Sequence, residues 1–268
     1  MSKNPIEKLA GFAVVTGASS GIGLELAKLA ARDRCDLLLV ADEGMDKAEA
    51  EARAAGAASV ETLEADLATE SGLDALEAAI GTRAVDALFA NAGEGYGGAF
   101  LECEWDHIAR VIDTNIKGTV SLIHRLGRKM RARGSGRILV TGSIAGAIPG
   151  PFNLTYNSTK AFIDDFCVGL AEEWKDSEVV ISCLLPGAAD TRFFERAGME
   201  DTRLAESAKV PLVGAEPADV AKGGYEALLK GETQDVHGFM NKLQHVFAGV
   251  LPSEVLAKMH SHLARSPS

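Results

Sequence analysis

The chain has 268 residues, of which 47% are hydrophobic and 24% charged, a composition that excludes a disordered or low-complexity protein. This length allows one large domain whose core needs no disulfide or structural metal. Because 38 acidic residues outweigh 27 basic ones, the net charge is −11, and no nucleic-acid or anionic-membrane surface is expected, since neutralising phosphate requires clustered lysine and arginine.

Short apolar runs alternate with helical patterns along most of the chain. Strands are expected at Phe12–Val15, Leu37–Ala41, Val60–Leu63, Val85–Ala90, Arg137–Thr141 and Val179–Leu185. Helical spacing covers Ile22–Ala30, Asp46–Ala55, Ser71–Ile80, Glu104–Arg133 and Asn153–Lys175. The alternation predicts an α/β fold with a doubly wound parallel sheet, Rossmann-like and in three layers. Because no linker or repeat divides the chain, we expect a single domain.

Two segments after the sixth predicted strand depart from this alternation. Residues 188–216 are irregular and mixed in composition, which is typical of a substrate lid that orders on binding. Residues 239–264 are expected to form a C-terminal helical extension, with a second short helix after Pro252. This extension is expected to pack on the body of the protein. The alternatives are that it covers the substrate pocket, completes a dimer or touches a membrane.

The cysteines and the first residues bear on the compartment. The four cysteines are scattered without a C-x-x-C pair, so buried thiols in a reducing compartment are expected. The N-terminal residues are polar, and no window approaches the apolar length of a membrane span. We therefore expect a cytoplasmic protein. The pair His260-x-His262 is expected to be a solvated tail rather than a zinc site, so no metal is expected.

A glycine-rich turn, Thr16-Gly17-Ala18-Ser19-Ser20-Gly21-Ile22-Gly23, joins the first strand to the first helix. Gly17 allows a tight turn, Gly21 lets a pyrophosphate approach the backbone, and Gly23 lets helix and strand pack closely. The helix N-terminus offers free N–H groups to phosphate, so Ser19, Ser20 and Ile22 are included in the predicted cradle. It is not a Walker loop, because no Gly-Lys-Ser/Thr follows.

Acidic and small residues follow the next strands. Asp42 ends the second strand nineteen residues after Gly23, where an acid accepts hydrogen bonds from the adenosine ribose and repels a 2′-phosphate. No lysine or arginine stands at Ser20 or within Asp42–Met45, so NAD is favoured over NADP. Asp66 and the adjoining Leu67 follow the third strand and cap the next turn or border the adenine. Small residues end the fourth strand, where a nucleotide would lie against the backbone of Asn91, Ala92 and Gly93.

The candidate reactive group is a tyrosine. Of three tyrosines, only Tyr156 has a lysine four residues later, Lys160, and residues at this spacing share one helix face. A neighbouring cation favours the phenolate and lowers the tyrosine pKa toward the working pH, as an acid/base catalyst requires.

These motifs fall in the order and spacing of the short-chain dehydrogenase/reductase family, which the chain resembles from Phe12 to about Thr191. The resemblance implies that Tyr156 is the acid/base, that Ser143 holds the substrate oxygen and that Lys160 lowers the tyrosine pKa and binds the nicotinamide ribose. Asn115 is implied to hold a water in a proton relay. Residues implied to border the cofactor are Asn91 on the adenosine side and, beside the nicotinamide, Pro186, Gly187 and Thr191.

The resulting hypothesis is an NAD(P)-dependent oxidoreductase that moves a hydride between nicotinamide and a secondary alcohol or ketone, which is a small-molecule substrate. The alternatives are an NADPH-linked 3-oxoacyl or carbonyl reductase and, in a different class, a non-catalytic nucleotide-binding scaffold. A homodimer or homotetramer is expected. The unusual C-terminus puts in doubt the tetramer common in the family, whereas a dimer through the helices Glu104–Arg133 and Asn153–Lys175 stays plausible.

Overall fold

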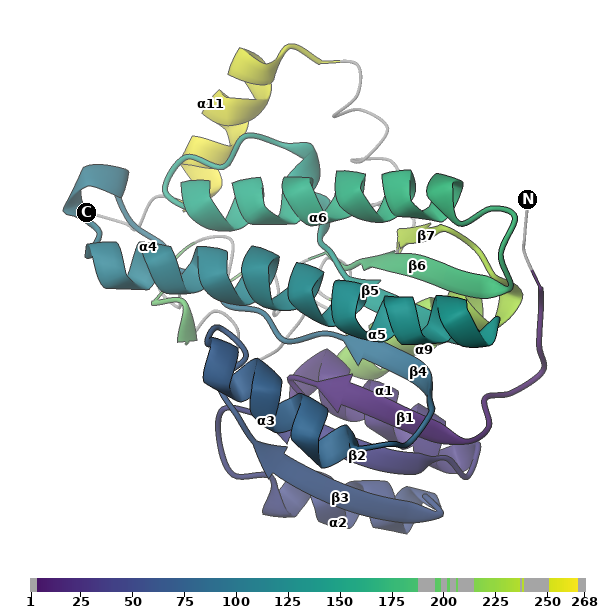
Figure 1. Cartoon of the computed structure of the whole chain (residues 1–268). Helices are drawn as coiled ribbons and strands as arrows, with labels where there is room; N and C mark the ends of the chain where they lie inside the picture. Colours follow the sequence, from purple (N-terminus) through teal and green to yellow (C-terminus); the bar gives the residue numbers. More distant parts are fainter. Residues whose placement is uncertain are drawn as a thin grey trace.

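The computed structural model describes residues 4–187, 196–198, 202, 206, 215–236, 238 and 251–264. Within these ranges one sheet contains seven parallel strands in the order β3-β2-β1-β4-β5-β6-β7 (Figure 1). The strands are β1 (Phe12–Thr16), β2 (Asp36–Ala41), β3 (Ser59–Glu64), β4 (Val85–Ala90), β5 (Gly136–Thr141), β6 (Val179–Leu185) and β7 (Gln234–Val236). The predicted doubly wound fold is confirmed.

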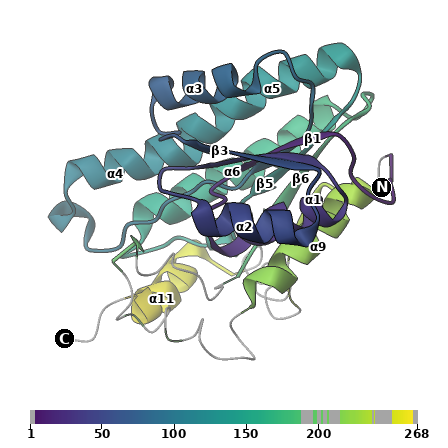
Figure 2. The same cartoon turned by 90° about the horizontal axis from the view of Figure 1, so that it is seen from below.

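Helices cover both faces of the sheet, as Figure 2 shows. One face carries α1 (Gly21–Arg32), α2 (Asp46–Ala55) and α9 (Pro217–Lys230), and the other carries α3 (Glu70–Ile80), α4 (Trp105–Ile112), α5 (Thr119–Arg133) and α6 (Leu154–Glu173). Along β1, Ala13 and Val15 belong to one hydrophobic core while Phe12 and Val14 belong to the other. Because successive side chains of a strand alternate between faces, a strand buried on both reads as one continuous apolar run.

The helix predicted over Glu104–Arg133 is not one continuous α-helix. It is divided into α4 and α5 by the π-helical segment Asp113–Gly118. A Cβ added to Gly118 would lie 2.6 Å from the Leu67 carbonyl oxygen, so this turn packs directly on the backbone that follows β3. Single π-helical turns within α-helices are frequent at functional sites.

The C-terminal third contains elements that the predicted pattern lacks. Strand β7 pairs with β6 at one edge of the sheet, and helix α9 precedes this strand in the chain. Helix α11 (Ser253–Ala264) matches the short helix expected after Pro252. Of the predicted lid 188–216, only Arg196, Ala197, Gly198, Thr202, Glu206, Ala215 and Glu216 are described. Residues 239–250 of the predicted extension, and Thr191, lie outside the described residues.

Helix α11 packs on the loop between β5 and α6. Leu256, His260 and Ala264 are buried, and His260 Nδ1 lies 3.1 Å from the Pro151 carbonyl oxygen. The expected solvated tail is therefore wrong for His260, which is 4% exposed because α11 turns it toward the body of the protein.

Other sequence expectations concern thiols and membranes. All four cysteines are free, and Cys35, Cys167 and Cys183 are buried while Cys103 is half-buried. Throughout the described part of the chain, no helix combines the length and the apolar character needed to cross a membrane.

Candidate active site

The strand order reverses at β1, which pairs with β2 on one side and β4 on the other. In doubly wound sheets a ligand binds in the crevice outside the carboxyl ends of the strands at this point. Gly17 and Gly21 have φ values of +62° and +56°, which glycine adopts without strain. A Cβ on Gly23 would lie 2.1 Å from the Gly17 carbonyl oxygen. These positions therefore require glycine, and the N-terminus of α1 is held against the strand end.

A polar network joins the ends of three strands behind this turn. The Thr16 hydroxyl accepts the N–H groups of Asn91 and Ala92, each at 3.0 Å. The Asn91 amide donates to the carbonyls of Thr16 and Gly17, and the Thr141 hydroxyl donates to its oxygen at 2.9 Å. The Asn91 side chain thus fixes the glycine-rich turn. Sequence reasoning did not include Thr16 or Thr141 among site residues, because a strand-end threonine carries no distinguishing pattern.

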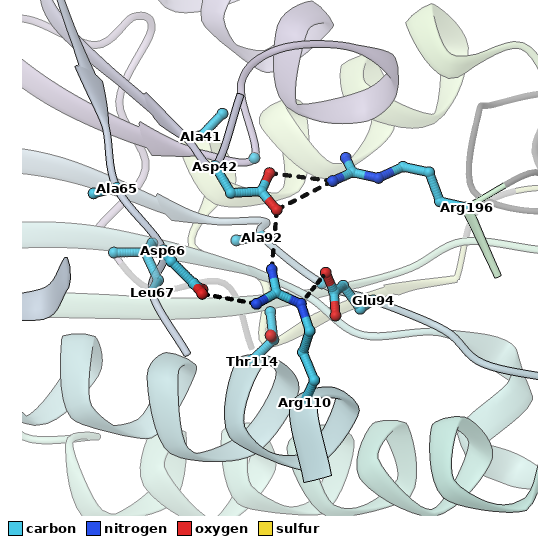
Figure 3. Close-up of a pocket in the computed structure, with 12 residues that line it drawn as sticks. Ala41, Asp42, Ala65, Asp66, Leu67, Ala92, Glu94, Arg110, Thr114 and Arg196 are labelled. Atoms are coloured by element: carbon cyan, nitrogen blue, oxygen red, sulfur yellow. Dashed lines mark hydrogen bonds and ion pairs between the residues drawn. The ribbon is translucent and has the colours of Figure 1, made fainter. Parts of the chain in front are cut away.

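A pocket lies beside the turn, where the adenosine half of a dinucleotide is expected (Figure 3). Its lining combines small and charged residues: Gly17, Ala41, Asp42, Ala65, Asp66, Leu67, Ala92, Gly93, Glu94, Arg110, Thr114 and Arg196. The predicted residues that follow β1, β2, β3 and β4 are therefore brought together.

The guanidinium of Arg110 forms ion pairs with three carboxylates at this pocket. Arg110, on α4, donates to Asp66 at 2.7 Å, to Glu94 at 2.9 Å and to Asp42 at 3.1 Å. Arg196 approaches Asp42 from the other side at 3.1 Å, as Figure 3 shows. No lysine or arginine stands at Ser20 or within Asp42–Met45, but the fold brings two arginines from elsewhere in the chain to Asp42. Arg110 lies 68 residues and Arg196 154 residues from Asp42, too far for any local spacing to reveal.

The network shifts the ionisation of its members. Burial favours the neutral form of Asp66, but hydrogen bonds from Arg110 and from the Ala68 N–H outweigh it and hold the pKa of this carboxyl below its usual value. Burial of the guanidinium lowers the pKa of Arg110, but Asp66 and Glu94 outweigh this effect and raise it. Asp66 therefore caps the following turn, through the Ala68 N–H, and also lines the pocket, whereas its place beside an adenine stays a prediction.

Ser143, Tyr156 and Lys160 meet at the carboxyl end of β5. Ser143 lies two residues after the end of the strand, and Tyr156 and Lys160 lie on one face of α6, with the Lys160 Nζ 5.8 Å from the Tyr156 ring centre. A hydrogen bond from the Ser143 hydroxyl favours the phenolate, yet burial is the larger effect and raises the pKa of Tyr156 to about 12. The net shift in the pKa of Tyr156 is therefore upward, opposite to the lowering expected from Lys160.

Lys160 is itself in an unusual environment. Its ammonium donates to the Thr141 carbonyl at 2.7 Å and is buried. Burial lowers the pKa of Lys160, and the Asp164 carboxylate partly opposes that effect. Gly93 lies beside both Lys160 and Asn115, because an added Cβ there would be 3.5 Å from the ammonium and 3.3 Å from the Asn115 amide oxygen. The lysine thus stands between the tyrosine and the strand ends that form the cofactor crevice.

Asn115 occupies the π-helical segment and is 1% exposed. Its amide nitrogen donates to the Glu94 carbonyl at 2.8 Å and to the Thr159 hydroxyl at 3.0 Å, and its oxygen accepts the Glu94 N–H at 2.8 Å. The side chain therefore ties the loop after β4 to the helix that carries Tyr156.

Pro186 and Gly187 follow β6 on the other side of Ser143. The Pro186 carbonyl accepts the Ile144 N–H at 3.0 Å, so this turn lies against the serine turn. Among the residues that the structure describes, no group of histidine, cysteine, aspartate and glutamate side chains is arranged to hold a metal ion.

Comparisons with known proteins agree with this geometry. The short chain dehydrogenase family profile matches residues 11–201. The 17-beta-hydroxysteroid dehydrogenase type 1 of Homo sapiens is 34% identical over 190 residues, which cover 68% of this chain and 58% of that protein. A short-chain dehydrogenase from Sphingobium yanoikuyae in complex with NADPH has a TM-score of 0.76 at 27% identity, covering 90% of this chain and 96% of the other.

A second solved structure extends the comparison. The 3-ketoacyl-(acyl-carrier-protein) reductase of Brucella melitensis, complexed with NADH, has a TM-score of 0.70 at 26% identity, covering 83% of this chain and 93% of the other. The chain belongs to the short-chain dehydrogenase family. Its match spans 58% of the length of the human relative.

Proposed function

We propose that the protein is an NAD(P)-dependent oxidoreductase that interconverts a secondary alcohol and a ketone. The observation that carries this proposal is the Ser143 hydroxyl bonded to Tyr156, with Lys160 on the same helix face. The cofactor fits the residues present: Gly17 and Gly23 let the N-terminus of α1 lie against the strand end, where its N–H groups can receive phosphate, and the charged pocket lies beside this turn. Bound nicotinamide would supply the hydride donor or acceptor.

The residues of the chain supply proton transfer and positioning. The Tyr156 hydroxyl is protonated at neutral pH even at the ordinary tyrosine pKa of 10.0, which burial raises to about 12, and it donates a proton to the ketone oxygen during reduction. Ser143 donates a hydrogen bond to the same oxygen as negative charge develops on it. Lys160, whose ammonium lies next to the Tyr156 ring, would hold the ribose hydroxyls of the cofactor. Pro186 and Gly187, which follow β6, would border the nicotinamide.

We propose NAD rather than NADP as the preferred cofactor, on the balance of charge at the pocket. Four carboxylates, those of Asp42, Glu43, Asp66 and Glu94, face the two guanidiniums of Arg110 and Arg196. The remaining negative charge disfavours a 2′-phosphate, while the Asp42 carboxylate suits ribose hydroxyls.

Two substitutions test the cofactor preference. Asp42→Ser should weaken NADH binding roughly tenfold, through loss of hydrogen bonds to a charged group, and weaken NADPH binding less. Arg110→Met should weaken NADPH more than NADH, because it removes positive charge, whereas Arg53→Met on the distant α2 should change neither. Fluorescence titration of both reduced cofactors measures these changes. Tight NADPH binding with weak NADH binding by the wild type would contradict the NAD proposal and favour the NADPH-linked 3-oxoacyl or carbonyl reductase.

The substrate class is open to a direct assay. A panel of steroid, sugar, acyl and small cyclic alcohols, followed by NADH formation, identifies the responding class. Absence of turnover with the whole panel in both directions, together with normal cofactor binding, would favour the nucleotide-binding scaffold instead.

We also propose that two chains associate through the outer faces of α4 and α6. Trp105 is 67% exposed, and Phe162 and Val168 are 44% and 43% exposed, an arrangement that a partner would cover. Phe162→Glu should shift sedimentation velocity toward the monomer, whereas Lys47→Glu on α2 should not. A wild-type chain that sediments as a monomer at micromolar concentration would contradict this proposal.

A further inference from the structure

Asp164 is a half-buried acid on α6, close to Lys160, and none of the proposed catalytic steps uses it. It lies on α6 one helical turn after Lys160, and its carboxylate faces the β5–α6 turn. It accepts a hydrogen bond from the Ser143 backbone N–H and another from the Cys183 thiol, at 3.6 Å. Burial raises the pKa of Asp164 to about 7, against the attraction of the Lys160 ammonium. A carboxylate in such a place is costly unless its oxygens are bonded and its charge is matched.

The turn around Ser143 is shaped to receive this carboxylate. A Cβ on Gly142 would lie 2.0 Å from Asp164 Oδ1, and one on Gly146 would lie 2.5 Å from Oδ2. Neither glycine has a positive φ, so the space occupied by the carboxylate, rather than backbone twist, requires glycine at both positions. The Asp164 carboxylate therefore packs against glycines on both sides of Ser143 in this segment.

We propose that Asp164 is a positioning residue for the ketone reduction: its carboxylate fixes the Ser143 turn against the helix that carries Tyr156 and Lys160. This proposal rests on the proposed function. Ser143 lies in the turn after β5, whereas Tyr156 and Lys160 lie on α6, and Asp164 bonds this helix to the backbone of the Ser143 turn. Small displacements of a catalytic group reduce turnover strongly, so a link between these elements has a direct kinetic consequence.

A matched pair of alanine variants tests the link. Asp164→Ala should lower kcat roughly tenfold or more while leaving NADH affinity unchanged, because the cofactor crevice lies beyond the turn. Asp165→Ala, which removes the neighbouring exposed acid of the same helix, should leave kcat unchanged. Asp164→Asn keeps an oxygen that accepts the Ser143 N–H and should retain more activity than the alanine variant. Equal kcat values for Asp164→Ala and wild type, or equal losses in both alanine variants, would overturn the proposal.

The pH dependence supplies a readout that mere loss of packing would not move. The titratable and charged groups facing Lys160 are Tyr156, Asp164 and Cys167 on α6 and Cys183 on β6. The Asp164 carboxylate raises the pKa of Lys160. In Asp164→Asn the alkaline limb of kcat should therefore move to lower pH, by about one unit, and in Asp165→Asn it should not move. An unshifted limb in Asp164→Asn would count against the proposal.

Hydrogen–deuterium exchange separates this proposal from the proposed function. The Ser143 N–H should exchange faster in Asp164→Ala than in wild type or Asp165→Ala, whether or not any ketone is turned over. If the wild type reduces no ketone but this exchange difference is present, the proposed function fails while the link from Asp164 to Ser143 stands. If ketone reduction is found but exchange at Ser143 is the same in all three proteins, the positioning role fails.

Discussion

Replacing Tyr156 by phenylalanine is expected to lower the turnover of any responding ketone by roughly 10³-fold, the size of effect typical of a lost general acid. The substitution removes the proton donor but leaves the ring and its place on α6. NADH binding and the melting temperature should therefore stay close to those of the wild type. Steady-state kinetics, with fluorescence titration of NADH on the same preparation, measure the effect.

Tyr225→Phe is the matched control. Tyr225 is buried, and its hydroxyl donates to Asp33 at 2.7 Å in the core formed by α1 and α9. Losing that hydrogen bond should cost about 1–2 kcal/mol of stability with no change in turnover. Turnover that survives in Tyr156→Phe would show that another group transfers the proton.

Gly23→Ala should sharply reduce cofactor binding. The added methyl group would lie 2.1 Å from the Gly17 carbonyl oxygen and 2.6 Å from the Asn91 amide nitrogen, and these atoms are held by the network of Thr16 and Thr141. The N-terminus of α1 must then move away from the strand end, so its N–H groups no longer converge on a phosphate. We expect at least a roughly tenfold loss of NADH affinity and about 1–3 kcal/mol of destabilisation from overpacking.

The control glycine lies in the middle of α6. Gly169 has nothing within 4 Å of the place where a Cβ would stand, so Gly169→Ala should raise stability by about 0.5–1 kcal/mol and leave NADH affinity unchanged. Urea unfolding and NADH titration distinguish the two variants. An unchanged NADH dissociation constant in Gly23→Ala would contradict the role given to this turn.

Much of the fold follows from local pattern. A strand buried on both faces requires a continuous apolar run, as in β4 and β6, and a helix on one face requires the spacing that marks α1 and α3. The π-helical break before α5 does not follow, because its packing partner is the Leu67 carbonyl on a distant segment. Strand β7 is three residues long, too short for an alternation to emerge.

The site divides in the same way. Tyr156 and Lys160 share a helix face because of their spacing alone, and the glycine-rich turn precedes α1 because chain order places it there. The basic neighbours of Asp42 cannot be found by spacing, since α4 and the segment around Arg196 approach it only in the folded chain. The charge at the adenosine pocket is therefore a property of the tertiary structure.

The sequence by itself determined the family and the doubly wound sheet. Spacing alone placed Tyr156 and Lys160 on one helix face, because residues four apart share a face, and the catalytic roles of Ser143, Tyr156 and Lys160 are those that the family resemblance implies. Tertiary structure alone decided the ionisation of that group. A nearby lysine favours the phenolate, but burial raises the pKa of Tyr156 to about 12. The burial of a side chain depends on every segment that packs around it, including segments far away in the sequence. It also decided the place of Asp164, which an isolated helix would expose to water and which the glycines after β5 enclose.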